Sequence, residues 1–96
     1  MAKGYWITIY HSVSDPGRLA QYAALAPAAI EKGGGRILAR AIAAATFEGG
    51  DNQRTTVIEF ESVQQAIDTY NSAAYQAAAT TLKGAAVREI RIIEGV

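Results

Sequence analysis

The sequence contains no cysteine, which excludes disulfide bonds, thiolate metal sites and a cysteine nucleophile. It has no excess of either charge, because nine Lys and Arg residues balance nine Asp and Glu residues. This balance argues against a nucleic acid or an anionic membrane as partner. No run approaches the roughly 18 apolar residues of a membrane span, and residues 1–10 lack the pattern of a signal peptide. We therefore expect a soluble cytoplasmic protein with neither a nucleic-acid nor a membrane partner.

Large hydrophobic side chains are also scarce. Half of the 96 residues are hydrophobic, but 20 of them are alanine and 5 are tyrosine, which leaves only 23 larger apolar residues. Alanine buries little area, and burial contributes roughly 25 cal/mol per Å². A chain of this length forms one domain, residues 1–96, and buries a smaller share of its surface than a longer chain. We expect a partner chain to complete this thin core.

Apolar periodicity and turn residues predict four strands and two helices. The strands are expected at residues 4–13, 36–48, 54–61 and 88–94. The first helix begins at Asp15-Pro16 and ends at Gly33-Gly34-Gly35, with a kink or short break near Ala26 because Pro27 follows. The second helix begins at Ser62, is interrupted at Asn71-Ser72, and ends near Gly84.

This order, β-α-β-β-α-β, is typical of a ferredoxin-like α+β fold, with two helices on one face of an antiparallel sheet. The strands are not uniformly polar on either face, so the face without helices also needs cover. The simplest cover is a homodimer formed by sheet-to-sheet packing.

Short motifs along nearly the whole chain carry a family resemblance. They are Gly4-Tyr5-Trp6, Asp15-Pro16, Tyr22, Gly34-Gly35-Arg36, Leu38-Ala39-Arg40, Glu48-Gly49, Arg54, Glu59-Phe60, Tyr70-Asn71-Ser72, Tyr75-Gln76 and Glu94-Gly95. The chain resembles the uncharacterised domain-of-unknown-function family numbered thirteen-thirty, in the dimeric α+β barrel superfamily. The resemblance implies a protomer whose sheet packs on a second protomer, and it implies no established reaction. Some proteins of this fold are cofactor-free oxygenases, haem-degrading enzymes or small-molecule isomerases.

Tyrosine and amide side chains on the two helices are the first candidates for a binding site. Tyr22, Tyr70, Asn71 and Tyr75 lie on helices that cover the same sheet face, so they can converge on a cavity for an aromatic or keto ligand. The alternative is that the tyrosines belong to the core and that Asn71 caps the helix break.

Arginine and histidine are the candidates for polar chemistry. Arg36 and Arg40 occupy alternate positions of the second strand and are expected on one face, where Arg40 can hold a carboxylate or phosphate. The alternative for Arg40 is a surface or intersubunit salt bridge, for example with Glu59. His11, the only histidine, is the candidate catalytic proton carrier, or else a strand-end residue bonded to backbone or solvent. One histidine and no cysteine predict no metal site, and we expect no cofactor.

The sequence thus favours a homodimeric small-molecule-binding protein acting on, or simply binding, a small organic acid or ketone. Its substrate-binding residues are expected to be Tyr22, Arg40, Asn71 and Tyr75, with His11 as the catalytic candidate. Two alternatives stay open, a non-catalytic dimeric stress or interaction module and a haem- or oxygen-handling monooxygenase-like enzyme. Whether the protein is an enzyme also stays open.

Overall fold

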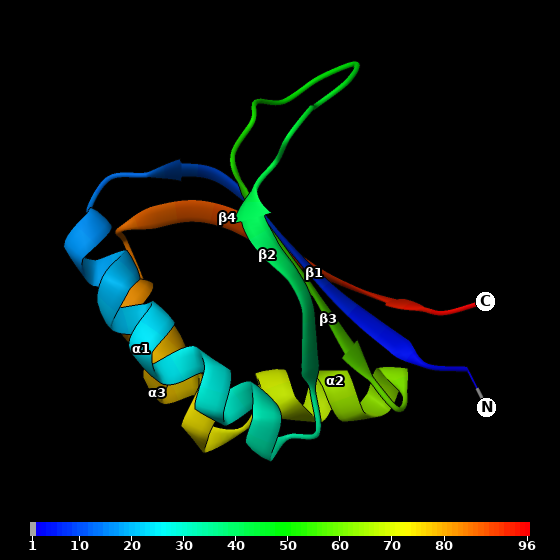
Figure 1. The fold of residues 1–96 in the computed structure, drawn as a ribbon. Coiled ribbons are helices and arrows are strands. Elements are labelled where there is room, and N and C mark those ends of the chain that lie inside the picture. The colour runs from blue at the N-terminus through cyan, green and yellow to red at the C-terminus, as the bar shows by residue number, and fades with distance from the viewer. Residues whose placement is uncertain (1) are drawn as a thin grey trace.

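A four-stranded antiparallel sheet with helices on one face forms the architecture (Figure 1). The computed structural model describes residues 2–96, and the strand order is β2-β3-β1-β4. The elements are β1 (Gly4–Val13), α1 (Pro16–Lys32), β2 (Arg36–Ile42), β3 (Arg54–Phe60), α2 (Val63–Tyr70), α3 (Ala73–Leu82) and β4 (Ala86–Glu94). This layout confirms the predicted ferredoxin-like α+β fold.

Side-chain caps begin each helix where the sequence predicts it. The Asp15 carboxylate accepts hydrogen bonds from the backbone N–H groups of Gly17 and Arg18, and Pro16 is the first helical residue. The Ser72 hydroxyl accepts from the backbone N–H of Tyr75 and starts α3, which confirms the predicted interruption.

Two details of the predicted elements are wrong. Of the kink or short break expected near Ala26, the break is absent, because α1 continues through Pro27. Core packing of Ala26 and Ile30 on either side outweighs the one hydrogen bond that a proline removes. β2 ends at Ile42 instead of Glu48, since alanine-rich sequence is poor strand material. Residues 43–53 instead form a loop that projects away from the body of the molecule (Figure 1).

The sheet has one face toward the helices and one open face, which we define as the face without helices. Alternate β1 residues Trp6, Thr8 and Tyr10 are buried toward the helices. The Trp6 ring is fully buried, and its centroid lies 4.8 Å from that of Tyr75. Tyr5, Ile7 and Ile9 lie on the open face.

A bulge in β2 changes the face of its later residues. Ile37 pairs with Ile58, but Ala39 pairs with Val57, so one extra residue is inserted between them. Arg36, which precedes the bulge, lies opposite Glu59 on the open face, where its Nη2 donates to a Glu59 carboxylate oxygen at 2.8 Å. The extra residue places Arg40 on the helix side. The prediction that Arg36 and Arg40 share one face is therefore wrong, and the ion pair expected of Arg40 with Glu59 is made by Arg36.

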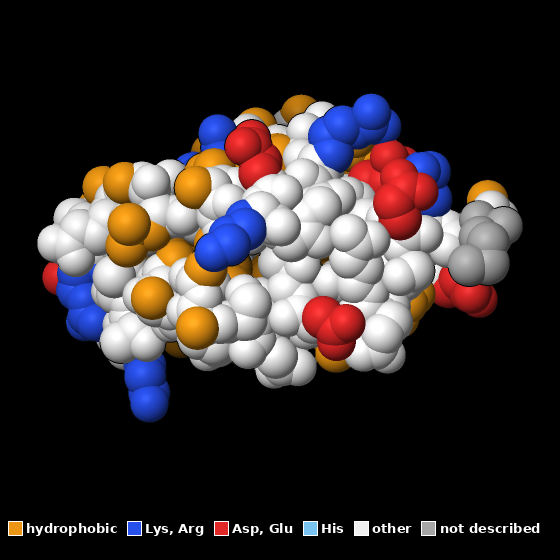
Figure 2. Space-filling model, turned by 90° about the horizontal axis from the view of Figure 1, so that it is seen from below, with side chains coloured by type: hydrophobic (Ala, Val, Ile, Leu, Met, Phe, Trp, Pro, Cys, Tyr) orange, Lys and Arg blue, Asp and Glu red, His pale blue; other side chains and the backbone are white. Residues whose placement is uncertain are grey.

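The side of the molecule on which Figure 1 places the helices shows no continuous area of one charge. Basic and acidic side chains of the described residues lie there singly or in small groups (Figure 2). Within residues 2–96, no helix has the length and apolar character needed to cross a membrane.

Candidate functional site

A cavity of about 30 Å³ lies between α1 and the helix side of the sheet. Its apolar wall includes Ala26, Pro27, Ile30 and Ile37. Its polar lining consists of Thr8, Tyr10, Tyr22, Arg40, Arg54, Thr56 and Arg88. We call this site the arginine cavity, because its three charged side chains are all arginines.

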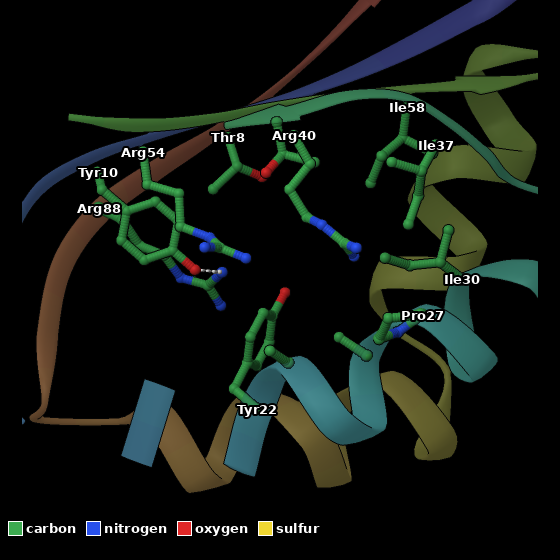
Figure 3. A pocket seen from close by; sticks show the side chains of 13 residues that line it. Thr8, Tyr10, Tyr22, Pro27, Ile30, Ile37, Arg40, Arg54, Ile58 and Arg88 are labelled. Carbon is green, nitrogen blue, oxygen red and sulfur yellow. Dashed lines mark hydrogen bonds between the residues drawn. The ribbon is translucent and has the colours of Figure 1, made fainter. Parts of the chain in front are cut away.

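The strand register brings these arginines together. Arg40 of β2 lies opposite Thr56 of β3, and Arg54 lies two residues earlier than Thr56 on the same face of that strand. In β4, Arg88 lies opposite Tyr10 of β1. Residues two apart on a strand, and those paired across it, share one side of the sheet. Figure 3 shows the three guanidinium groups pointing into the same space from three strands.

Arg88 is held in place by aromatic side chains. Its Nη1 donates to the Tyr10 hydroxyl at 3.3 Å, and its Nη2 donates to the Tyr75 hydroxyl at 3.2 Å. The guanidinium carbon also lies 4.5 Å from the centroid of the Tyr22 ring, which is a cation–π distance. Arginine stays charged throughout the range in which proteins function. These contacts fix the direction of the positive charge without neutralising it.

The Tyr22 and Tyr75 hydroxyls form a short hydrogen bond behind the cavity, with their oxygens 2.6 Å apart. Tyr75 is fully buried, and burial raises the pKa of its phenol well above the ordinary value, so the hydroxyl stays protonated. Because Tyr75 already accepts a hydrogen bond from Arg88, it can donate its own proton to Tyr22. The Tyr22 hydroxyl, which points into the cavity (Figure 3), is then free to donate to a ligand.

Among residues 2–96, no acidic side chain lines the arginine cavity. In the part of the chain that the structure describes, ion pairs join Lys3 to Glu61, His11 to Glu89, Arg36 to Glu59 and Arg91 to Glu89. None of them involves Arg40, Arg54 or Arg88. The half-buried Arg88 attracts an anion more strongly than an exposed charge does, and Arg40 and Arg54 add to this attraction. The same residues 2–96 hold no group of three or more histidine and carboxylate side chains that could bind a metal ion.

The structure brings three of the five sequence candidates together. Tyr22 and Arg40 line the cavity, and Tyr75 supports Tyr22 from behind. Asn71 is exposed at the C-terminal end of α2, where its backbone N–H bonds to the Ile67 carbonyl, and it does not line the cavity. His11 is the extra residue at a bulge in β1, and its Nε2 lies 3.3 Å from a Glu89 carboxylate oxygen, away from the cavity.

Sequence reasoning missed Tyr10, Arg54 and Arg88 as cavity residues. Most of the chain separates Tyr10 from Arg88 in the sequence, and only the register of β1 and β4 makes them neighbours. An available signal was the absence of an acidic residue at alternate positions beside Arg88, since Ala86 and Ile90 share its face.

The strand order and the helices on one face define a ferredoxin-like α+β protein. More specifically, the chain belongs to the family described as a domain of unknown function (DUF1330), whose model matches residues 3–96. A search of curated proteins finds no match.

Solved structures share this fold at low sequence identity. A protein of unknown function from Rhodopseudomonas palustris is 11% identical, with a TM-score of 0.78 over 99% of this chain and 83% of that one. The cofactor-independent oxygenase SnoaB from Streptomyces nogalater is also 11% identical, with a TM-score of 0.70 over 97% and 92% of the two chains. An ethyl tert-butyl ether D family protein from Bacillus halodurans is 12% identical, with a TM-score of 0.64 over the full length of both chains. At these identities the similarity establishes the fold alone.

Proposed function

We propose that the protein is a homodimeric small-molecule-binding protein whose ligand is a small organic anion held in the arginine cavity. The observation that carries this proposal is the convergence of Arg40, Arg54 and Arg88 without a carboxylate partner among residues 2–96. Uncompensated charges next to a cavity cost stability unless a ligand neutralises them. The Tyr22 hydroxyl adds a neutral donor aimed at the same space.

The size of the cavity favours a compact ligand. About 30 Å³ is two to three times the minimum space of about 10–15 Å³ that one water molecule needs. A single carboxylate or carbonyl group therefore suits the interior, and the rest of the ligand lies at the mouth. Arg40 is exposed and can follow the ligand there, whereas Arg88 is partly buried and fixed.

The same groups support chemistry without a cofactor. An arginine beside a keto oxygen, with the Tyr22 hydroxyl donating to it, polarises the carbonyl group by stabilising negative charge on that oxygen. The description of SnoaB as cofactor-independent agrees with such chemistry, by analogy of fold. His11 is not a lining residue of the cavity in the protomer, so this proposal assigns it no proton transfer.

A second copy of the chain is proposed to cover the open face of the sheet. Apolar side chains from three strands lie there at least partly exposed, namely Ile7, Ile9, Val57, Val87 and Ile93. The charged residues between them, Arg36, Glu59, Glu89 and Arg91, are paired with one another, so this face of a thin-cored protein suits face-to-face packing with an identical sheet. Its opposite side holds the cavity, so the two protomers are proposed to keep one cavity each.

Isothermal titration calorimetry with pyruvate and propionate tests the ligand proposal. We expect both acids to bind, and Tyr22→Phe and Arg40→Gln to raise the Kd by about tenfold or more, as loss of a charge-assisted hydrogen bond does. Arg36→Gln is the matched control, since this arginine lies on the same strand but pairs with Glu59 on the open face. Failure of every acid to bind the wild-type protein at tens of millimolar would contradict the proposal.

A further inference from the structure

We propose that the ligand of the arginine cavity is a dianion with two acidic groups on a short apolar spacer, which makes it a compact dicarboxylate. This inference rests on the proposed function, because it specifies what the same cavity recognises.

The charge balance of the cavity favours a dianion. Three guanidinium groups point into one space, and no described carboxylate forms an ion pair with any of them. A monocarboxylate would leave two of the three charges uncompensated, whereas a dicarboxylate would leave one. Arg40, Arg54 and Arg88 repel one another, and this repulsion is stronger near the half-buried Arg88 than in water, so each added anionic group is favoured.

The three arginines define an inner and an outer position for acidic groups. The inner position has the partly buried Arg88, fixed by the Tyr10 and Tyr75 hydroxyls, with the Tyr22 hydroxyl beside it. The outer position has the exposed Arg40 and, diagonally across the strand pair, Arg54. Because a cavity of about 30 Å³ has room for one acidic group, a second group remains outside, within reach of the outer arginines.

An apolar wall lies beside these positions. Pro27, Ile30 and Ile37 line the same cavity and offer no hydrogen bond through their side chains. Methylene groups of a spacer gain from contact with this wall, but a hydroxylated or charged spacer loses solvation there. This step distinguishes a dicarboxylate from a single phosphate group, which has its charge on one centre.

Chain-length-matched acids provide the test. Succinate is compared with butyrate, and malonate with propionate, at pH 7.5 and constant ionic strength, by calorimetry and by Trp6 fluorescence. Trp6 is a suitable reporter because its Nε1 donates to the hydroxyl of Thr8, a cavity residue, at 2.9 Å. We expect each dicarboxylate to bind about tenfold or more tightly than its monocarboxylate partner, as a second charge-assisted contact implies.

Arg40→Gln should weaken the binding of both members of each pair, and that of the dicarboxylate by about tenfold more, so that the difference between them falls to about twofold or less. Arg54→Gln is a second variant with the same expected direction, in case the first fails to fold, and Arg36→Gln should keep the wild-type preference. Inorganic phosphate is included as a compact anion without a spacer.

Equal affinities for the two members of each pair would overturn the dianion inference and leave the proposed function standing. Tighter binding of phosphate than of every dicarboxylate would also overturn it, since one acidic centre would then suffice. Absence of binding by every acid would overturn both proposals together.

Discussion

Replacing Tyr75 with phenylalanine should destabilise the protein by about 2 kcal/mol. Tyr75 is fully buried, so the phenylalanine ring keeps its packing against Trp6, and only the hydroxyl is lost. Loss of the 2.6 Å hydrogen bond to Tyr22 costs about 1 kcal/mol. Loss of the 3.2 Å hydrogen bond from Arg88 would cost about 1.5–3 kcal/mol if the guanidinium were dry, but Arg88 is partly exposed and regains water, so we count about 1 kcal/mol.

Tyr22→Phe is the matched variant. It removes the same hydroxyl–hydroxyl bond but leaves Tyr75 hydrogen-bonded to Arg88, and it keeps the ring under the guanidinium carbon. Its expected cost is about 1 kcal/mol, half that of Tyr75→Phe. The double variant should cost about 1 kcal/mol less than the sum of the two single changes, because both remove one shared bond.

Urea unfolding followed by Trp6 fluorescence measures these differences, at one fixed protein concentration because the proposed dimer would be less stable when dilute. The corresponding decrease in Tm for Tyr75→Phe is roughly 8–16 °C for a domain of this size. A cost for Tyr75→Phe no larger than that for Tyr22→Phe would refute the reasoning, since the Arg88 contact would then contribute nothing. Additive single changes would refute the shared bond.

Three further outcomes are expected. Burial raises the pKa of Tyr75 above its usual 10, so the unfolded state loses the phenol proton first as the pH rises. Above pH 10 the free energy of unfolding should therefore fall by roughly 1.4 kcal/mol per pH unit more in the wild-type protein than in Tyr75→Phe. Urea titrations of both proteins at pH 9–11.5 measure these slopes, and equal slopes would contradict the prediction. Gly4→Ala should lower the stability by about 1–3 kcal/mol in thermal unfolding, because its Cβ would lie 2.5 Å from a backbone carbonyl oxygen, whereas Gly49→Ala meets no atom within 4 Å and should be neutral. Ile9→Asp on the open face should convert the proposed dimer to a monomer in sedimentation velocity, whereas Leu25→Asp on α1 should leave the dimer intact. Unchanged sedimentation of both variants would contradict sheet-to-sheet packing.

The fold was predictable from the sequence because local signals agree with one another. The caps at Asp15, Ser62 and Ser72 all begin helices as expected, and the four strands appear in the expected order. The exceptions arise where tertiary packing outweighs a local preference, as at Pro27, or where alanines fail to extend β2. Such errors move a boundary and leave the topology unchanged.

The cavity was predictable only in part, because strand register determines it. Alternation along a strand identifies residues on a common face until an extra residue is inserted, and no residue type in Arg36–Ile42 announces the bulge. That single insertion separates Arg36 from Arg40 and moves Arg40 from an expected shared face into the cavity. His11 is likewise the extra residue at the bulge in β1. The sequence therefore gave no indication that Tyr10, and not His11, contacts Arg88.

Arg40, Arg54 and Arg88 lack the carboxylate partners that other arginines of the described sheet have. Elsewhere, Arg36 and Arg91 have carboxylate partners, and such pairing is the ordinary way to place a cation on a sheet. Arg40, Arg54 and Arg88 repel one another on the helix side of the sheet, so folding alone favours their replacement by apolar residues. Tyr10, Tyr22 and Tyr75 hold Arg88 in its position without cancelling its charge. Groups that are fixed by the fold yet unfavourable to its stability are the ones expected where a ligand of opposite charge completes the site.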